Sequence, residues 1–187
     1  MKHLVDRGWV ALLLISCVAL WSAQATQDDD RLEDLFKELR EAQNPVDARI
    51  FEDAIWRVWL QTGDRELDRL MREGTRAMNT GRAELARDRY NEIVRRAPDY
   101  AEGWNKRATL HFLMHDFDAS IADIDRTLAL EPRHFGALSG LGQIRDVMEQ
   151  PDAALDAYER ALALHPFMLG ARERVRQLQE FFRQQQI

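Results

Sequence analysis

The 34 residues from Phe135 to Met168 read FGALSGLGQIRDVMEQPDAALDAYERALALHPFM. Apolar and small residues recur at helical spacing on both sides of a short turn that ends at Pro151, and Pro166 follows the second run. Proline disfavours helical backbone geometry in the residue before it, but it is tolerated in the first turn of a helix. The stretch therefore predicts two short helices that run antiparallel, because so few residues connect them.

The same pattern recurs at a constant interval along the chain. Pro98, Pro132 and Pro166 follow one another at intervals of 34 residues. Aligning the chain on these prolines brings three further sets of residues into register: Gly74, Ala108 and Gly142; Ala86, Ser120 and Ala154; Tyr90, Ile124 and Tyr158. Small residues allow two helices to approach to about 8–10 Å, and the bulky third set fills the space one turn further along. Three stacked hairpins are expected.

This period and pattern resemble the tetratricopeptide repeat, a helical hairpin with the signature W-x2-L-G-x2-Y, A-x3-F and a final P. The third copy carries Leu141, Gly142, Ala154, Tyr158 and Pro166. The second copy departs from the signature, since His111 stands where an aromatic residue is usual and Ser120 where alanine is usual. The resemblance covers residues 67–166. It implies an all-α fold, an α-solenoid of antiparallel helical hairpins with three tetratricopeptide-like repeats.

The flanking residues predict a divergent hairpin before the repeats and one helix after them. Asn44 and Pro45 form a helix start signal ahead of an apolar stripe that ends at Trp59. Downstream, a stripe from Ala171 to Phe182 gives the last helix an apolar face to cover the third hairpin. We therefore divide the chain into residues 1–25 (leader), 26–66 (divergent N-terminal hairpin that begins the stack), 67–100, 101–134 and 135–168 (three repeats) and 169–187 (capping helix).

The first 25 residues have the pattern of a secretory leader. Lys2 and Arg7 precede an uncharged apolar run, and Ala23 and Ala25 supply small residues before a cleavage point at Thr26. An exported, periplasmic product is expected. Two alternatives remain: a retained anchor helix, and a lipobox in which Cys17 is lipidated and holds the protein to the membrane. Membrane contact is expected only in these two cases.

Composition excludes several function classes. The hydrophobic fraction of 45% and the charged fraction of 31% are typical of a folded, soluble protein. A net charge of −6 disfavours a nucleic acid partner. Cys17 is the single cysteine, so the cleaved product would have no disulfide, no cysteine-ligated zinc and no thiolate nucleophile.

The candidate chemical motifs fit packing better than catalysis. His111 and His115 are four residues apart on one predicted helix, but His111 holds the position of a packing aromatic and His115 lies at a turn. Gly140 and Gly142 lack the strand and the third glycine of a dinucleotide-binding loop. Ser139 does not have the flanking glycines of a nucleophile elbow. We predict a non-enzymatic protein without a cofactor or a metal.

The family resemblance implies that the first helices of the repeats line a concave groove that holds a segment of another protein. Carried onto this sequence, the lining comprises Met71, Arg72, Thr75, Met78, Asn105, Lys106, Thr109, Phe112, Ser139, Gln143 and Asp146. Asn105 is expected at the centre, facing solvent, while Arg174 is expected on the outer face, away from any function. The alternative is a self-associating structural module, whose groove is filled by its own or a neighbour's N-terminal hairpin.

The family's clamp for chaperone C-terminal carboxylates uses lysine, asparagine and arginine at defined positions. Here those positions hold Met71, Thr75, Lys106, Gly136 and Gly140. The departure argues against a chaperone-tail receptor. An adaptor, scaffold or assembly factor of the cell envelope is the function expected instead.

Overall fold

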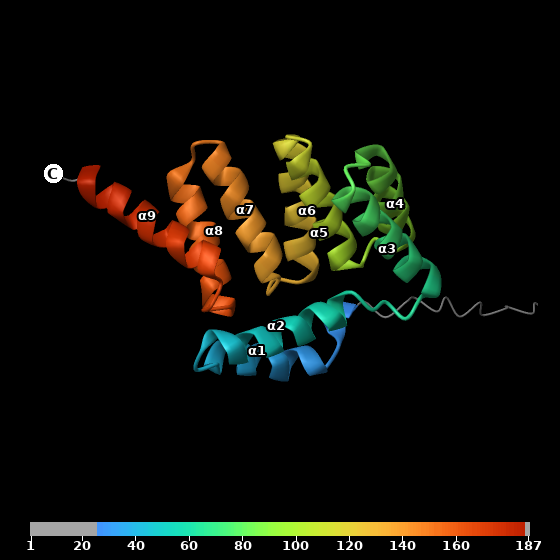
Figure 1. The fold of residues 1–187 in the computed structure, drawn as a ribbon, viewed down its shortest axis with the longest axis horizontal. Coiled ribbons are helices and arrows are strands. Elements are labelled where there is room, and N and C mark those ends of the chain that lie inside the picture. Colours follow the sequence, from blue (N-terminus) through green and yellow to red (C-terminus); the bar gives the residue numbers. More distant parts are fainter. Residues whose placement is uncertain (1–25, 186–187) are drawn as a thin grey trace, which may run out of the picture.

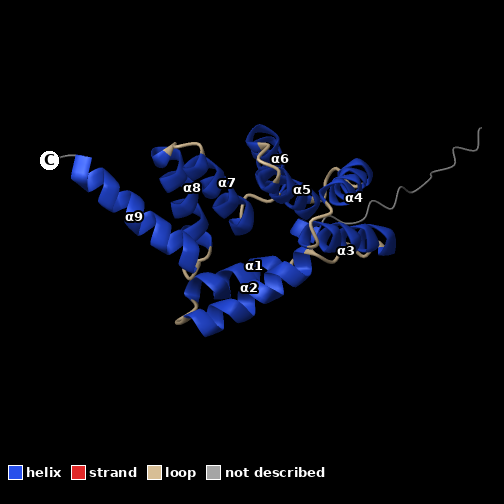
Figure 2. Ribbon diagram, turned by 45° about the horizontal axis from the view of Figure 1, so that its top comes forward, coloured by secondary structure: helices blue, strands red, loops and turns tan. Residues whose placement is uncertain are grey.

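A computed structural model describes residues 26–185 as a row of helical hairpins above a crosswise pair of helices (Figure 1). The elements are a 3-10 turn η1 (Thr26–Asp28), α1 (Arg31–Glu41), α2 (Pro45–Trp59), α3 (Arg65–Asn79), α4 (Ala83–Arg96), α5 (Ala101–Leu113), α6 (Phe117–Leu130), α7 (Phe135–Val147), α8 (Pro151–Leu164) and α9 (Leu169–Gln185). Every regular element in this range is helical (Figure 2), which confirms the all-α prediction. The expected leader, with Cys17, lies outside the described residues.

Glycine–tyrosine contacts hold two of the repeated hairpins together. A Cβ atom added at Gly74 would lie 2.7 Å from the Tyr90 ring, and one at Gly142 would lie 2.7 Å from the Tyr158 ring. A side chain at either glycine would therefore push the two helices of its hairpin apart. In the middle hairpin the buried Ser120 hydroxyl donates instead to the carbonyl of Ala108 at 2.7 Å.

The turns inside the three hairpins are also copies of one another. Gly81, His115 and Glu149 follow at the 34-residue interval, and all three have positive φ angles, 70°, 59° and 56°. In each turn the next amide donates back to a carbonyl in the last helical turn, as in the 2.9 Å bond from Arg82 N to Ala77 O. This is the left-handed helix ending that glycine favours, and two of the three copies form it without glycine.

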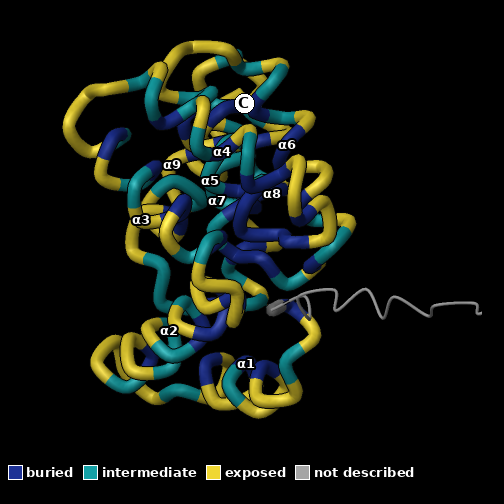
Figure 3. The backbone as a smooth tube through the Cα atoms, turned by 90° about the vertical axis from the view of Figure 1, so that its right-hand side faces the viewer, coloured by how far each residue is buried: buried dark blue, intermediate teal, exposed yellow. Residues whose placement is uncertain are grey.

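The N-terminal hairpin does not begin the stack, contrary to the sequence-based expectation. Figure 3 shows α1 and α2 as a separate layer beneath the other helices. Phe36 and Trp59 of this layer share one buried cluster with Phe135 at the start of α7, and Leu164 and Phe167 pack against it. The Tyr100 hydroxyl donates to the Trp59 carbonyl at 2.9 Å and ties the end of α2 to α5. The hairpin thus crosses the ends of the repeats and packs against apolar side chains near the turns between successive hairpins.

The last helix covers the third hairpin. Ala171 and Leu178 are buried and share a cluster with Ala154 and Tyr158 of α8. One expectation about this helix is wrong: Arg174 is not an idle outer-face residue, because its guanidinium donates to Asp146 of α7 at 2.7 and 3.0 Å. Within residues 26–185, no helix combines the length and the apolar character needed to cross a bilayer.

Candidate functional site

The candidate site is the surface formed by α3, α5 and α7, which we call the groove face. Two hollows lie on it. Met71, Arg72, Thr75 and Lys106 line the first; Asn105, Thr109, Phe112 and Gln143 line the second. The remaining three expected lining residues line neither: Met78 packs against the core of the first hairpin, Ser139 is half-buried, and Asp146 binds Tyr158 and Arg174.

The first hollow, the α3 pocket, is wide and open, with a volume of about 770 Å³. Residues that sequence reasoning missed complete its wall: Leu60, Gln61, Asp68, Arg76, Asn79 and Thr80. Arg72 and Arg76 are exposed one helical turn apart, and neither has an ion pair among the described residues. Arg76 could have been predicted in this wall, because it lies four residues after Arg72 on the same helix. Leu60 could not be placed, because its position depends on where the N-terminal hairpin packs.

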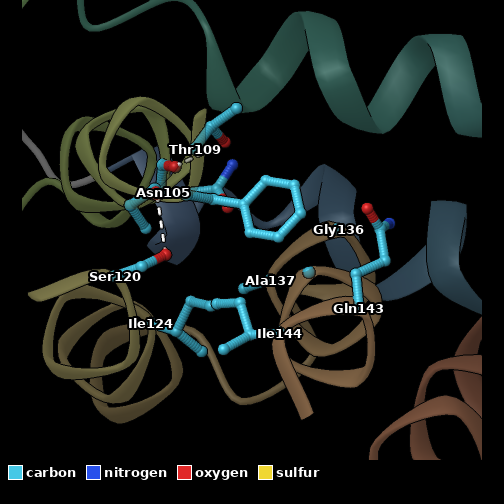
Figure 4. A pocket seen from close by; sticks show the side chains of 11 residues that line it. Asn105, Thr109, Ser120, Ile124, Gly136, Ala137, Gln143 and Ile144 are labelled. Atoms are coloured by element: carbon cyan, nitrogen blue, oxygen red, sulfur yellow. Dashed lines mark hydrogen bonds between the residues drawn. The ribbon is translucent and has the colours of Figure 1, made fainter. Parts of the chain in front are cut away.

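The second hollow, the α7 cavity, is smaller, at about 150 Å³, and more enclosed. Ala108, Ile124, Ala137 and Ile144 give it a buried apolar floor, and they belong to one packed cluster. In Figure 4 the side chains of Ile124 and Ile144 lie next to each other, facing Asn105 and Thr109. An apolar floor under a polar rim can bind one apolar side chain of a peptide while the peptide backbone stays at the rim.

Between the two hollows lies a buried charge network centred on Glu102. Its carboxylate is 3.1 Å from the Lys106 ammonium, and it accepts hydrogen bonds from Asn105 at 2.8 Å and from the ring of His134 at 3.0 Å. His134 Nδ1 accepts the Ala137 amide at 3.1 Å, so its proton lies on Nε2 and points at Glu102. The side chains of Glu102 and His134 have no exposed area.

The protonation of this network follows from its partners. Burial by itself raises the pKa of Glu102, but the Lys106 charge and the hydrogen bonds from His134 and Asn105 outweigh it, and the pKa lies below its ordinary value. The Glu102 carboxylate in turn raises the pKa of Lys106. The pair is therefore ionised at neutral pH, with its charges compensated inside the fold.

Two tryptophans of α2 close this network from the other side. Trp59 stacks on His134, with ring centroids 4.2 Å apart, and the Lys106 ammonium lies 5.4 Å from the centre of the Trp56 ring. Trp56 also lies against Gly136, where an added Cβ would come within 2.8 Å of its ring. The N-terminal hairpin thus covers the starts of α5 and α7 and leaves the rest of the groove face open.

Comparison with known proteins assigns the architecture to a family. The family model for the tetratricopeptide repeat matches residues 71–114 and 106–168, which together make up more than half of the chain. The chain belongs to the tetratricopeptide repeat family. Domains of this family are protein–protein interaction modules and are generally non-catalytic.

A tetratricopeptide repeat-containing protein of Rhizobium etli is 40% identical over 114 residues, which cover 61% of this chain and 56% of the relative. The chain thus spans about half the length of that relative. Among solved structures, the first tetratricopeptide domain of Spaghetti, bound to an HSP90 peptide, matches with a TM-score of 0.60 at 23% identity, over 63% of this chain and 94% of that one. MamA matches with a TM-score of 0.57 at 20% identity, over 83% and 81%. Both structures support the fold.

The middle tetratricopeptide repeat differs from expectation at its central residue. Asn105 was expected to face solvent, but it is buried, with 7% of its surface exposed. Its amide donates to Glu102, and Trp56 of α2 lies over the neighbouring Lys106. Sequence reasoning did not predict this, because it did not anticipate the buried Glu102 carboxylate that Asn105 binds. Thr109, one turn further along α5, is the exposed residue at this point of the groove face.

The two histidines of the same repeat have acidic and aromatic neighbours. His111 is 3.7 Å from Asp116 and 3.8 Å from Asp123, and the latter is held by Arg107 at 2.7 Å. His115 lies against the edge of Phe117. Within residues 26–185, no group of three or more histidine, cysteine or acidic side chains is placed to hold a metal ion.

Proposed function

We propose that this chain is a non-catalytic adaptor, scaffold or assembly factor that binds a segment of another protein along its groove face. The α3 pocket and the α7 cavity lie on one surface, and Lys106 and Asn105 on adjacent positions of α5 separate them. Their combination of apolar floors with arginine, threonine and glutamine side chains matches what a peptide offers: apolar side chains on a hydrogen-bonding backbone. This pairing of two hollows carries the proposal.

We place this function in the bacterial cell envelope. The leader pattern of residues 1–25 motivates export, with cleavage before Thr26. Among the described side chains, that of Gln27, just after this cut, is buried and takes part in the fold. Its amide donates to the Asp99 carbonyl at 2.6 Å. Lipidation of Cys17 would give a membrane-anchored form of the same module.

Self-association is the competing proposal, and the position of the N-terminal hairpin bears on it. The hairpin of the same chain already lies across the starts of α5 and α7, and it leaves both hollows open. A neighbouring copy would therefore have to fill the hollows with another segment. Light scattering over a range of protein concentrations separates the two proposals, since self-association predicts a growing mass and adaptor function predicts a constant one.

The proposal is tested by affinity capture from an envelope extract with paired variants. Thr109→Arg places a long charged side chain on the groove face, whereas Ala122→Arg places the same side chain on an exposed position of α6. A partner identified by mass spectrometry should be retained by wild type and Ala122→Arg and lost from Thr109→Arg. A partner retained equally by both variants would contradict binding at the groove face.

A further inference from the structure

The α7 cavity arises from a glycine that the protein itself does not need. Helix α7 carries Gly136, Gly140 and Gly142, although glycine inside a helix costs about 1 kcal/mol relative to alanine. The protein's own packing explains two of them: Gly136 makes room for Trp56 and Gly142 makes room for Tyr158. At Gly140, an added Cβ would meet only Ile124 Cδ1 at 3.8 Å, which is ordinary contact.

The same positions in the earlier repeats carry long charged side chains. Arg72 and Lys106 precede Gly140 at the 34-residue interval, and Glu102 precedes Gly136. The third repeat therefore replaces an acid–base pair, one helical turn apart, with two glycines. One half of the bare surface that results is filled by Trp56, an apolar side chain from α2. The other half, over Gly140, is the α7 cavity.

We propose that the α7 cavity is a specificity pocket that takes one apolar side chain of leucine size from the bound partner segment. This inference rests on the proposed groove function and names the anchor residue of its ligand. A cavity of about 150 Å³ with an aliphatic floor has room for about six carbon atoms, the size of benzene. Alanine leaves most of that volume empty, and charged side chains meet an apolar floor.

The rim of the cavity fits the backbone on either side of such an anchor. Gln143 is exposed at the rim, and its amide makes no hydrogen bond with the described residues. It can donate to one peptide carbonyl and accept from one peptide amide. The Thr109 hydroxyl already donates to the Asn105 carbonyl at 3.0 Å and can only accept from the segment, whereas Gln143 can both donate and accept.

The pocket is tested in the full chain with two small probes, N-acetyl-leucinamide and N-acetyl-alaninamide. With isoleucine methyl groups labelled for NMR, the leucine probe at millimolar concentration should shift Ile124 and Ile144, while Ile93, in the core of the first hairpin, stays in place. The alanine probe should shift neither. Equal shifts from both probes, or no shift from the leucine probe, would overturn the proposal. Shifts of Ile124 and Ile144 on concentrating the protein alone would assign the pocket to a second copy and also overturn it.

Filling the cavity gives the matched variant. Gly140→Leu puts a leucine side chain into the space from within the protein, whereas Gly170→Leu adds the same side chain to an exposed position of α9 with no atom within 4 Å. Gly140→Leu should abolish the probe shifts, weaken partner binding at least ten-fold and retain the wild-type fold by circular dichroism. Gly170→Leu should leave both the probe shifts and partner binding as in wild type. A partner lost from Thr109→Arg but kept by Gly140→Leu would overturn the pocket and leave the groove function. Probe shifts with no captured partner would leave the pocket and count against the function.

Discussion

The indole ring of Trp59 lies flat against the imidazole ring of His134, with centroids 4.2 Å apart and planes inclined by 9°. This contact joins the last residue of α2 to the residue that caps the start of α7. Behind the imidazole lies the buried Glu102 carboxylate, so one stack connects the N-terminal hairpin, the third repeat and the charge network of the second. The crosswise hairpin is therefore an integral part of the fold.

Replacing Trp59 with alanine should destabilise the whole protein. The side chain is 1% exposed and fills the space between Phe36, Phe135 and His134, so its removal leaves a cavity. The expected loss is about 3–5 kcal/mol in the free energy of unfolding by urea. The adjacent Leu60→Ala, at an exposed position, should cost less than about 1 kcal/mol. Equal effects of the two variants would show that the stack does not hold the hairpin in place.

Glu102→Gln should destabilise the protein and flatten its response to acid. The variant leaves Lys106 largely buried beside a neutral amide, which costs about 3 kcal/mol. In the folded chain the pKa of Glu102 lies below the ordinary 4.5, so the unfolded chain takes up this proton first. The contribution of the carboxylate is complete above about pH 4.5 and is lost as the pH falls through its lower folded pKa.

Urea unfolding at several pH values between 3 and 6 measures this effect. Glu180→Gln is the matched control, because Glu180 pairs with Arg183 on the exposed surface of α9. Wild type and Glu180→Gln should lose stability in parallel as the pH falls, while Glu102→Gln loses less. An acid response of Glu102→Gln as steep as that of wild type would contradict the role given to the buried carboxylate.

Glycine at the non-glycine turn positions should stabilise the repeats. His115 and Glu149 have the left-handed backbone conformation that Gly81 has in the first repeat. Left-handed geometry costs a side-chain-bearing residue about 1–2 kcal/mol, and the greater freedom of unfolded glycine offsets part of the gain. His115→Gly should therefore raise the free energy of unfolding by about 0.5–1 kcal/mol, and Gly81→Ala should lower it by about 1 kcal/mol. Calorimetric melting measures whether His115→Gly gains stability and whether Gly81→Ala loses it. A loss of stability in His115→Gly would contradict the prediction.

Removing residues 169–187 should cause aggregation or a loss of cooperative unfolding, since it uncovers the apolar face of α8 at Ala154 and Tyr158. A milder version of the same test is Leu178→Ala, at a buried position, which should cost about 2–4 kcal/mol. Gln177→Ala, next to it on the exposed side, serves as the control. An unchanged melting curve for the truncated chain would show that α9 does not act as a cap.

The sequence predicted the repeats well because their contacts are local and periodic. Gly74 meets Tyr90 and Gly142 meets Tyr158 within one hairpin, so a 34-residue alignment is enough to pair them. The place of the N-terminal hairpin could not be read in this way. It depends on Trp59 meeting His134, 75 positions along the chain, and on no repeated pattern.

The candidate site was predicted less completely for the same reason. The family resemblance, carried over at the 34-residue interval, placed Thr75, Thr109 and Gln143 on the groove face, where they line the two hollows. The buried Glu102 carboxylate accepts from His134, which caps α7, and from Asn105, while Trp56 of α2 lies against the Lys106 ammonium that pairs with it. A charged residue is rarely buried without such partners. Because these partners could not be identified from the sequence, Glu102 was not predicted to lie inside the fold.

The affinity of a peptide selected from a random display library tests groove binding most directly, measured by fluorescence anisotropy on Thr109→Arg, Ala122→Arg and wild-type chains with folding verified by circular dichroism. The arginine at position 109 projects from the lining of the α7 cavity on the groove face, while that at position 122 projects from α6. Binding at the groove face predicts at least a ten-fold loss of affinity for Thr109→Arg, about 1.4 kcal/mol, and wild-type affinity for Ala122→Arg. Equal affinities for all three chains would contradict it.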